Sequence, residues 1–298
     1  MNQNSTNSRR LFLQQLGVVG AGLVGLPYLT TGCNSQSKSS KQVSMPVNNL
    51  VKDIGVQIYS VRNELNQDLE GTISAIANLG YSCIEAYDLG LDGKFFGQYT
   101  PEDFNAIVTD TGMYIASVHT GYFTHEQADI FINAALAMNT KHIVIPYLDE
   151  GMRGDYGAVA ENLNRVGELS TSAGLRFGYH NHDFEFLLTS DERVPMEILI
   201  NETDADKVSF QADLYWVRKA GIDPLEFVQK YPGRFMSYHV KDANSSLDQT
   251  TVGEGIIPFP EIFVLNETSG VDYLFVEDER TETPIQNIRA ALSYLNTL

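Results

Sequence analysis

The chain of 298 residues contains only two cysteines, one tryptophan and 20 basic residues, against 38 acidic ones. Two cysteines cannot form a network of disulfide bridges, so the hydrophobic core must stabilise the fold. The shortage of positive charge leaves a net charge of −18. A field of that sign repels nucleic-acid backbones and phosphorylated ligands, so the composition argues against both as partners.

The N-terminus lacks an apolar run long enough to span a membrane. The uncharged, glycine-rich stretch from Leu16 to Leu29 is too short for a comfortable transmembrane helix. Arg9 and Arg10 precede this stretch, and the motif TTGC follows it. This order predicts an export signal of the twin-arginine type over residues 1–33 and a periplasmic location.

Cys33 ends that signal, in a motif that resembles a bacterial lipobox. The resemblance implies acylation of its thiol, so we expect the protein to contact the membrane only through a lipid on Cys33. The alternative is an ordinary exposed thiol in a linker. Residues 34–49 predict a flexible tether because they are mostly polar and rich in serine. Cleavage before Cys33 would remove two arginines and no acid, which takes the net charge from −18 to −20.

From about residue 50 onward, short apolar runs alternate with helical patterns. The helical patterns have apolar residues at spacings of three and four, as from Asp68 to Leu79 and from Asp155 to Ala173. The apolar runs occupy residues 53–59, 83–88, 114–120, 142–147, 175–181, 208–213, 235–242 and 273–278. Eight such runs predict the α/β class and a single (β/α)₈ TIM barrel over residues 50–298, with Cys83 buried in its core. An open doubly wound sheet is disfavoured because no glycine-rich dinucleotide fingerprint follows the first run.

Polar residues gather at the C-terminal ends of the predicted strands, where TIM barrels place their active sites. The last four strands carry His180, Asp213, His239 and Glu277 there. Their nitrogen and oxygen donors suit one divalent metal ion, namely Mn²⁺, Zn²⁺, Co²⁺ or Mg²⁺. Taken singly, each has another interpretation: Asp213 as a helix N-cap, either histidine as a hydrogen-bonded strand residue, and Glu277 as a solvated charge.

Several motifs in residues 50–298 resemble the sugar phosphate isomerase/epimerase family of xylose isomerase-like TIM barrels. They are GVQIYSVR (55–62), SVHTGY (117–122), FGYHNHDFEF (177–186), DLYWV (213–217), HVKD (239–242), VGEGIIPF (252–259) and FVEDER (275–280). Members of the family hold a divalent metal with Glu, Asp, His and Glu from strands five to eight. Asp213, His239 and Glu277 match the last three ligands. His180 stands where glutamate is usual, which resembles the branch that contains inosose dehydratases.

The resemblance implies metal-dependent chemistry next to a carbonyl of a sugar or cyclitol. Epimerases of the family often use two glutamates on opposite faces of the substrate, but an imidazole bound to a metal has no lone pair left to act as a base. An elimination or hydrolysis therefore becomes more attractive beside isomerization and epimerization. We expect an unphosphorylated substrate, such as a free sugar, a keto-glycoside or a cyclitol, because Glu254 lies between two glycines where barrels often bind phosphate.

Further strand-end residues are candidates for roles in the site. The candidate acid–base residues are Glu277, Lys241, His182 and Glu85. The candidate substrate-binding residues are His119, Tyr59, Gln57, Trp216 and Glu254. Lys241 either polarises a carbonyl or forms an ion pair with Asp242 or Glu277. Trp216 either stacks on a sugar ring or packs a helix against the barrel.

Three other functions fit parts of this pattern. A carbohydrate-binding lipoprotein without catalysis would suit the lipid anchor, although the intact Asp213, His239 and Glu277 do not suggest lost activity. A hydrolase of keto-glycosides would use the same metal ligands. A DNA-repair endonuclease of the same superfamily would need more metal ligands and a phosphate-binding surface, which this acidic chain lacks.

Overall fold

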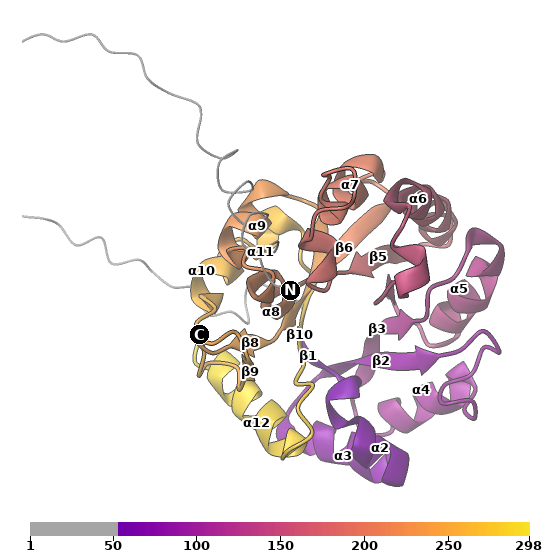
Figure 1. Ribbon diagram of the computed structural model, residues 1–298. Coiled ribbons are helices and arrows are strands. Elements are labelled where there is room, and N and C mark those ends of the chain that lie inside the picture. The colour runs from indigo at the N-terminus through magenta and orange to yellow at the C-terminus, as the bar shows by residue number, and fades with distance from the viewer. Residues whose placement is uncertain (1–52) are drawn as a thin grey trace, which may run out of the picture. The chain divides into compact units, whose positions relative to one another are not determined.

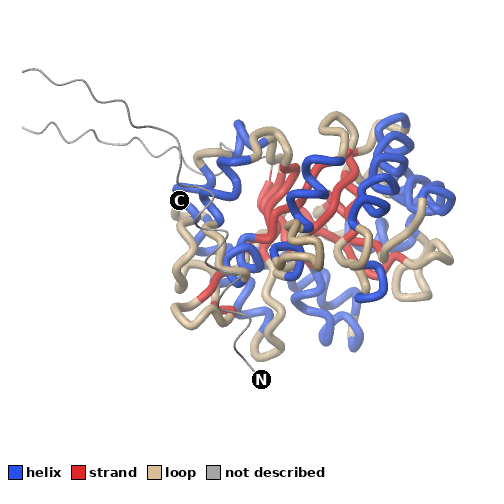
Figure 2. Tube along the Cα trace, turned by 45° about the horizontal axis from the view of Figure 1, so that its top comes forward, coloured by secondary structure: helices blue, strands red, loops and turns tan. Residues whose placement is uncertain are grey.

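The computed structural model describes residues 53–298, and the predicted export signal, Cys33 and the predicted tether lie outside this range. Eight parallel strands close into a barrel in the order β1-β10-β7-β6-β5-β4-β3-β2. Figure 1 shows the strands at the centre with helices around them, and Figure 2 shows the same two layers after a rotation. The predicted (β/α)₈ TIM barrel is confirmed.

Every barrel strand overlaps the apolar run that predicted it. The strands are β1 (Asp53–Gln57), β2 (Cys83–Leu89), β3 (Tyr114–Thr120), β4 (His142–Ile145), β5 (Arg176–His180), β6 (Val208–Asp213), β7 (Phe235–Val240) and β10 (Tyr273–Val276). The α-helices are α2 (Arg62–Gln67), α3 (Leu69–Leu79), α4 (Pro101–Thr109), α5 (Ala128–Ala137), α6 (Tyr156–Ser172), α7 (Pro195–Glu202), α8 (Leu214–Lys219), α9 (Pro224–Lys230), α10 (Phe259–Phe263), α11 (Asn266–Ser269) and α12 (Pro284–Leu295). Within residues 53–298, none of the helices is long and apolar enough to cross a membrane.

The first strand is two residues shorter than its apolar run because the chain turns after Gln57. Residues Ile58–Val61 form the 3₁₀ helix η2. The Gln57 side chain accepts a hydrogen bond from the Tyr59 amide at 3.0 Å, and the Ser60 hydroxyl donates to the Gln57 carbonyl at 2.7 Å. These local hydrogen bonds take the place of the inter-strand backbone hydrogen bonds that a longer strand would make. The turn places Tyr59 at the rim of the barrel.

The barrel interior below the site is filled by large side chains that face glycines. A Cβ on Gly55 would lie 2.8 Å from the Phe275 ring, and a Cβ on Gly178 would lie 2.6 Å from Cε of Met236. Both contacts are closer than packed atoms allow, so these positions admit no side chain unless a neighbour moves. Cys83 lies in the same interior layer as a free, buried thiol, as predicted, and burial raises its pKa to about 12.

The loop after β7 is organised by one carboxylate. Residues Asp242–Ala243 form β8, which pairs with β9 (Gln249–Thr250). The buried Asp242 side chain accepts hydrogen bonds at 2.8–3.2 Å from four backbone amides, those of Ala243, Gly253, Gly255 and Ile257. The two glycine amides are therefore bound to the protein's own carboxylate. This arrangement favours the expectation that the Gly253–Gly255 turn holds no phosphate.

We predict that Asp242→Ala destabilises the protein by about 2–4 kcal/mol, because charged hydrogen bonds to several amides are lost together. Urea unfolding followed by circular dichroism measures the change. Asp248→Ala, which removes an exposed acid from the same hairpin, is the control and should leave stability within about 0.5 kcal/mol of wild type. Equal stability of wild type and Asp242→Ala would show that water replaces the carboxylate at no cost.

Candidate functional site

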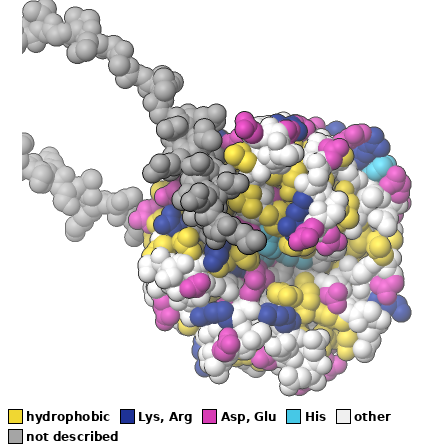
Figure 3. Space-filling model, in the orientation of Figure 1, with side chains coloured by type: hydrophobic (Ala, Val, Ile, Leu, Met, Phe, Trp, Pro, Cys, Tyr) yellow, Lys and Arg dark blue, Asp and Glu magenta, His cyan; other side chains and the backbone are white. Residues whose placement is uncertain are grey.

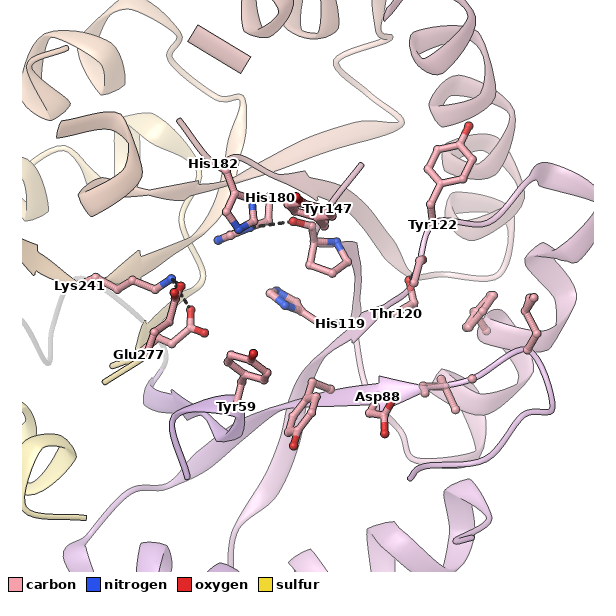
Figure 4. A pocket seen from close by; sticks show the side chains of 18 residues that line it. Tyr59, Asp88, His119, Thr120, Tyr122, Tyr147, His180, His182, Lys241 and Glu277 are labelled. Atoms are coloured by element: carbon pink, nitrogen blue, oxygen red, sulfur yellow. Dashed lines mark hydrogen bonds and ion pairs between the residues drawn. The ribbon is translucent and has the colours of Figure 1, made fainter. Parts of the chain in front are cut away.

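A cavity of about 560 Å³ opens at the C-terminal ends of the strands. Figure 3 shows histidine side chains at the bottom of a depression in the visible face, and Figure 4 shows the residues around it. Among the predicted site residues, the cavity is lined by Tyr59, His119, His180, His182, Lys241 and Glu277. The strand-end rule therefore located the cavity correctly.

The four predicted metal ligands converge at the floor of this cavity. His180, Asp213, His239 and Glu277 are all buried, and their ligand atoms lie within 4.8 Å of one another. Nε2 of His180 is 3.2 Å from Oδ2 of Asp213, and Nδ1 of His239 is 2.7 Å from Oε2 of Glu277. The strand ends have thus brought together two imidazoles and two carboxylates in one buried cluster.

Hydrogen bonds behind the two histidines define which ring nitrogen faces the cluster. Nδ1 of His180 is 3.1 Å from the Pro146 carbonyl oxygen, which can only accept, so Nδ1 carries the proton and Nε2 keeps a free electron pair. Nε2 of His239 donates to Glu85 in the same way. Nδ1 of His239 is buried and makes no hydrogen bond within residues 53–298, despite its proximity to Glu277. If both rings were neutral, their electron pairs would face carboxylate oxygens. The arrangement therefore needs positive charge, which a proton on His239 together with the Lys241 ammonium, or a metal ion, can supply.

The electrostatics of the cluster also require positive charge. Burial alone would lower the pKa of His239, but the charges of Glu85 and Glu277 raise it to about 10. Burial alone would raise the pKa of Asp213 and of Glu277, but the Lys241 ammonium, with smaller effects from the histidines, holds both well below their usual range. The cluster therefore favours a proton or a metal ion at its centre.

Lys241 is a buried cation at the edge of the cluster. Its Nζ lies 2.9 Å from Asp213, 2.8 Å from Glu277 and 2.5 Å from Glu279. Glu277 and Asp242 were the two predicted ion-pair partners of Lys241. The structure pairs Lys241 with Glu277, whereas the Asp242 carboxylate binds the backbone amides of the loop described above. Glu279 also lines the cavity and was not predicted. It follows Glu277 by two residues, and residues two apart along an extended segment point to the same face.

Two predicted site residues lie beneath the cavity instead of in its mouth. Gln57 and Glu85 are completely buried and are not among the residues that line the cavity. The Glu85 carboxylate accepts hydrogen bonds from Gln57 at 3.0 Å and from Gln211 at 2.7 Å, in addition to the one from His239. The structure corrects the expectation of an acid–base role for Glu85 and of substrate contact for Gln57. Glu85 accepts the hydrogen bond from His239, and Gln57 donates to Glu85, so the two residues together orient the His239 ring.

His119 and His182 reach the cavity from opposite sides of the cluster. Burial lowers the pKa of His119 to about 4, despite the nearby Glu85. Burial, followed by its proximity to His180 and to the Lys241 ammonium, lowers the pKa of His182 to about 2. Both rings are therefore neutral near pH 7. Nδ1 of His182 is itself buried and has no hydrogen-bond partner within the described residues.

Two predicted substrate contacts do not line the cavity. Trp216 packs beside His182 with ring centroids 5.3 Å apart, as the packing alternative proposed. Glu254 is exposed on its loop. An unpredicted residue, Glu185, is buried behind His182 and accepts a hydrogen bond from its amide at 2.9 Å. Sequence periodicity gave no signal for it, because a turn after β5 brings it there.

Comparison with known proteins identifies the family. A family model described as xylose isomerase-like TIM barrel matches residues 73–298. The chain belongs to this family. Among curated proteins, an inosose dehydratase from Geobacillus thermodenitrificans is 26% identical over 151 residues, which cover 45% of this chain and 50% of that protein. The chain thus spans about half the length of the curated relatives it matches.

Solved structures share the xylose isomerase-like fold over more of the chain. A sugar phosphate isomerase/epimerase from Parabacteroides distasonis has a TM-score of 0.71 and 29% identity, covering 82% of this chain and 93% of that one. A 3-keto-D-glucoside 4-epimerase from E. coli has a TM-score of 0.58 and 16% identity, covering 78% of this chain and 95% of that one. The second likeness supports the fold only.

We predict that Glu85→Gln weakens divalent-metal binding about 10- to 100-fold, because the carboxylate that orients His239 loses its charge. Calorimetric titration of the metal-free protein with Zn²⁺ or Mn²⁺ measures the affinity. The control is Glu102→Gln, an exposed glutamate in α4, which should bind like wild type. Unchanged affinity in a correctly folded Glu85→Gln variant would show that the charge of Glu85 does not contribute to metal binding.

We also predict that metal affinity in this xylose isomerase-like barrel rises with pH. Without a metal, His239 has a pKa of about 10, so a metal ligated by Nδ1 must displace a proton at neutral pH. The dissociation constant should fall about tenfold for each unit that the pH rises from about 6 to 8. Titrations in several buffers would also detect the released proton as heat. An affinity independent of pH over this range would contradict ligation by His239.

Proposed function

We propose that the protein is a divalent-metal-dependent enzyme that acts next to the carbonyl of an unphosphorylated sugar, keto-glycoside or cyclitol. The reaction would be an isomerization, an epimerization or an elimination. The carrying observation is the buried set of two imidazole nitrogens and two carboxylate oxygens at the cavity floor. The relatives named as inosose dehydratase and as sugar phosphate isomerase/epimerase support carbohydrate chemistry.

The donor set fits a metal by its own chemistry. The ligands would be His180 through Nε2, His239 through Nδ1, and the carboxylates of Asp213 and Glu277. Two nitrogen and two oxygen donors suit Mn²⁺, Zn²⁺ or Co²⁺, with Mg²⁺ as a further candidate. When bound, the ion would supply Lewis acidity, which polarises the substrate carbonyl and acidifies the neighbouring C–H bond.

Proton transfer is assigned to residues outside the donor set. Glu279 lines the cavity and has a carboxylate side chain that is 35% exposed, so it can take the proton from the carbon next to the carbonyl. Burial alone would lower the pKa of Lys241, but the charges of Asp213, Glu277 and Glu279 raise it well above its usual value. Lys241 therefore stays charged. Its ammonium can therefore donate a hydrogen bond to a carbonyl or departing oxygen but cannot act as the base. His182 lines the cavity and would bind a substrate hydroxyl there.

The proposal extends to where the protein acts. We infer that it is exported by the twin-arginine route and anchored in the cell envelope by a lipid. This part rests on Arg9, Arg10 and Cys33 in the sequence alone. An unphosphorylated substrate agrees with such a location, and also with the net charge of −18 and with the glycine amides already bound to Asp242.

The test separates metal ligands from the proposed base. His180→Ala and His239→Ala should lose tightly bound metal and turnover together, whereas Glu279→Gln should keep the metal and lose at least about 100-fold in turnover. Metal analysis and NMR detection of deuterium incorporated from solvent into keto-glycosides, ketoses and inososes provide the readouts. His125→Ala, which changes a half-buried histidine outside the cluster, is the control. A metal-free but active His239→Ala variant would refute the mechanism.

A non-catalytic carbohydrate-binding protein is the second candidate, because the same cavity would accept a sugar without chemistry. It predicts that the wild-type protein binds the keto-sugars without solvent exchange at any carbon. Deuterium incorporation by wild type and its loss in Glu279→Gln would reject this candidate.

A further inference from the structure

The cavity extends well beyond the four metal-ligand residues. In Figure 4, Lys241, Glu277 and His182 lie on one side of His119, whereas Asp88 and Tyr122 lie on the other. The volume of about 560 Å³ falls within the range of about 300–1,000 Å³ that accommodates ligands larger than a single sugar ring. We call the second part of the cavity the distal compartment. It is lined by Asp88, Leu91, Thr120, Gly121 and Tyr122.

One wall of the distal compartment is a loop that the fold holds in place. The loop follows β2 and contains isolated bridges that join Phe95 to Leu89 and to Tyr99. Phe95 is completely buried and stacks on Phe104 of α4 with centroids 4.5 Å apart. The Phe96 amide donates to the Asp88 carbonyl at 3.1 Å. The wall is therefore formed before a ligand binds, which lowers the entropic cost of binding.

The chemistry of the distal compartment combines apolar surface with a hydrogen-bond acceptor. The Leu91 side chain is 54% exposed, and Tyr59, between the two parts of the cavity, is 39% exposed with Tyr87 perpendicular to it at 5.2 Å. The Asp88 carboxylate accepts no hydrogen bond from the described residues. Aromatic and aliphatic groups pack on the C–H faces of a sugar, and a carboxylate binds its hydroxyls. A purely apolar ligand would make no use of the Asp88 carboxylate.

We propose that the distal compartment binds a second sugar ring, the aglycone of a keto-disaccharide whose first ring lies over His180 and Glu277. The assignment of the first ring rests on the proposed function. The proposal restricts the substrate class to glycosides that carry a second ring, in preference to free monosaccharides or cyclitols. The distal compartment contributes affinity and specificity, while the reacting atoms stay at the cluster.

Gly121 permits a direct test of this assignment. It is exposed, it lines the distal compartment, and a Cβ built on it would meet no atom within 4 Å. Gly121→Trp should therefore fill part of the distal compartment without disturbing the core. Gly154 is a matched control, because it is also exposed with open space around its Cβ but does not line the cavity.

The experiment compares a methyl keto-glucoside with the corresponding keto-disaccharide. We expect wild type to prefer the disaccharide in kcat/KM by about tenfold or more. Gly121→Trp should lower kcat/KM for the disaccharide about tenfold and leave the methyl glycoside nearly unchanged, and Gly154→Trp should change neither. Equal kcat/KM of wild type for both substrates would overturn the proposal. A phenyl keto-glucoside preferred over the disaccharide would overturn the assignment of a sugar.

A binding measurement separates this proposal from the proposed function. Calorimetry with the unoxidised disaccharide and the unoxidised methyl glucoside requires no turnover. Suppose that no keto-sugar reacts, but the disaccharide binds more tightly than the methyl glucoside and Gly121→Trp abolishes this difference. The proposed function would then fail, and the assignment of the distal compartment would stand. If the keto-sugars react but neither binding nor kcat/KM depends on the second ring, the proposed function stands and the distal site fails.

Discussion

The need for positive charge where two imidazoles and two carboxylates meet in a buried space is the constraint on which the site depends. Two imidazole nitrogens and two carboxylate oxygens face one another where water cannot screen them. The fold fixes each donor from behind. Asp213 is an example, because its Oδ1 accepts the Trp216 amide at the start of α8 at 2.9 Å, which leaves Oδ2 to face the cluster. Its predicted role as an N-cap and its predicted role as a ligand are therefore compatible.

The barrel supplies this arrangement through the alternation of its strands. Every second side chain points inward, and the inward-pointing residues of alternate strands stack in layers. Phe275 and Met236 fill the layer opposite Gly55 and Gly178, and a polar layer around Glu85 lies above them. The cluster forms the next layer, at the mouth. The apolar layer thus supports the polar one, and the polar layer orients the ligands.

The sequence was sufficient to predict the barrel and the four clustered donors, because both follow from local periodicity and from the ends of the strands. Depth within the barrel was not predictable in the same way. Glu85 and His119 both point inward, but only His119 reaches the cavity, since the stagger between β2 and β3 decides which layer each residue joins. Glu185 was missed for a different reason, because a turn and not a strand positions it.

The two histidines of the cluster differ in how easily mutation can disturb them. The Nδ1 proton of His180 is held by the main-chain carbonyl of Pro146, an acceptor that every amino acid at that position would provide. The Nε2 proton of His239 is held by the side chain of Glu85, which a change in one codon can remove. The tautomer of His180 is therefore fixed by the path of the backbone, whereas the tautomer of His239 depends on the side chain at one position, residue 85.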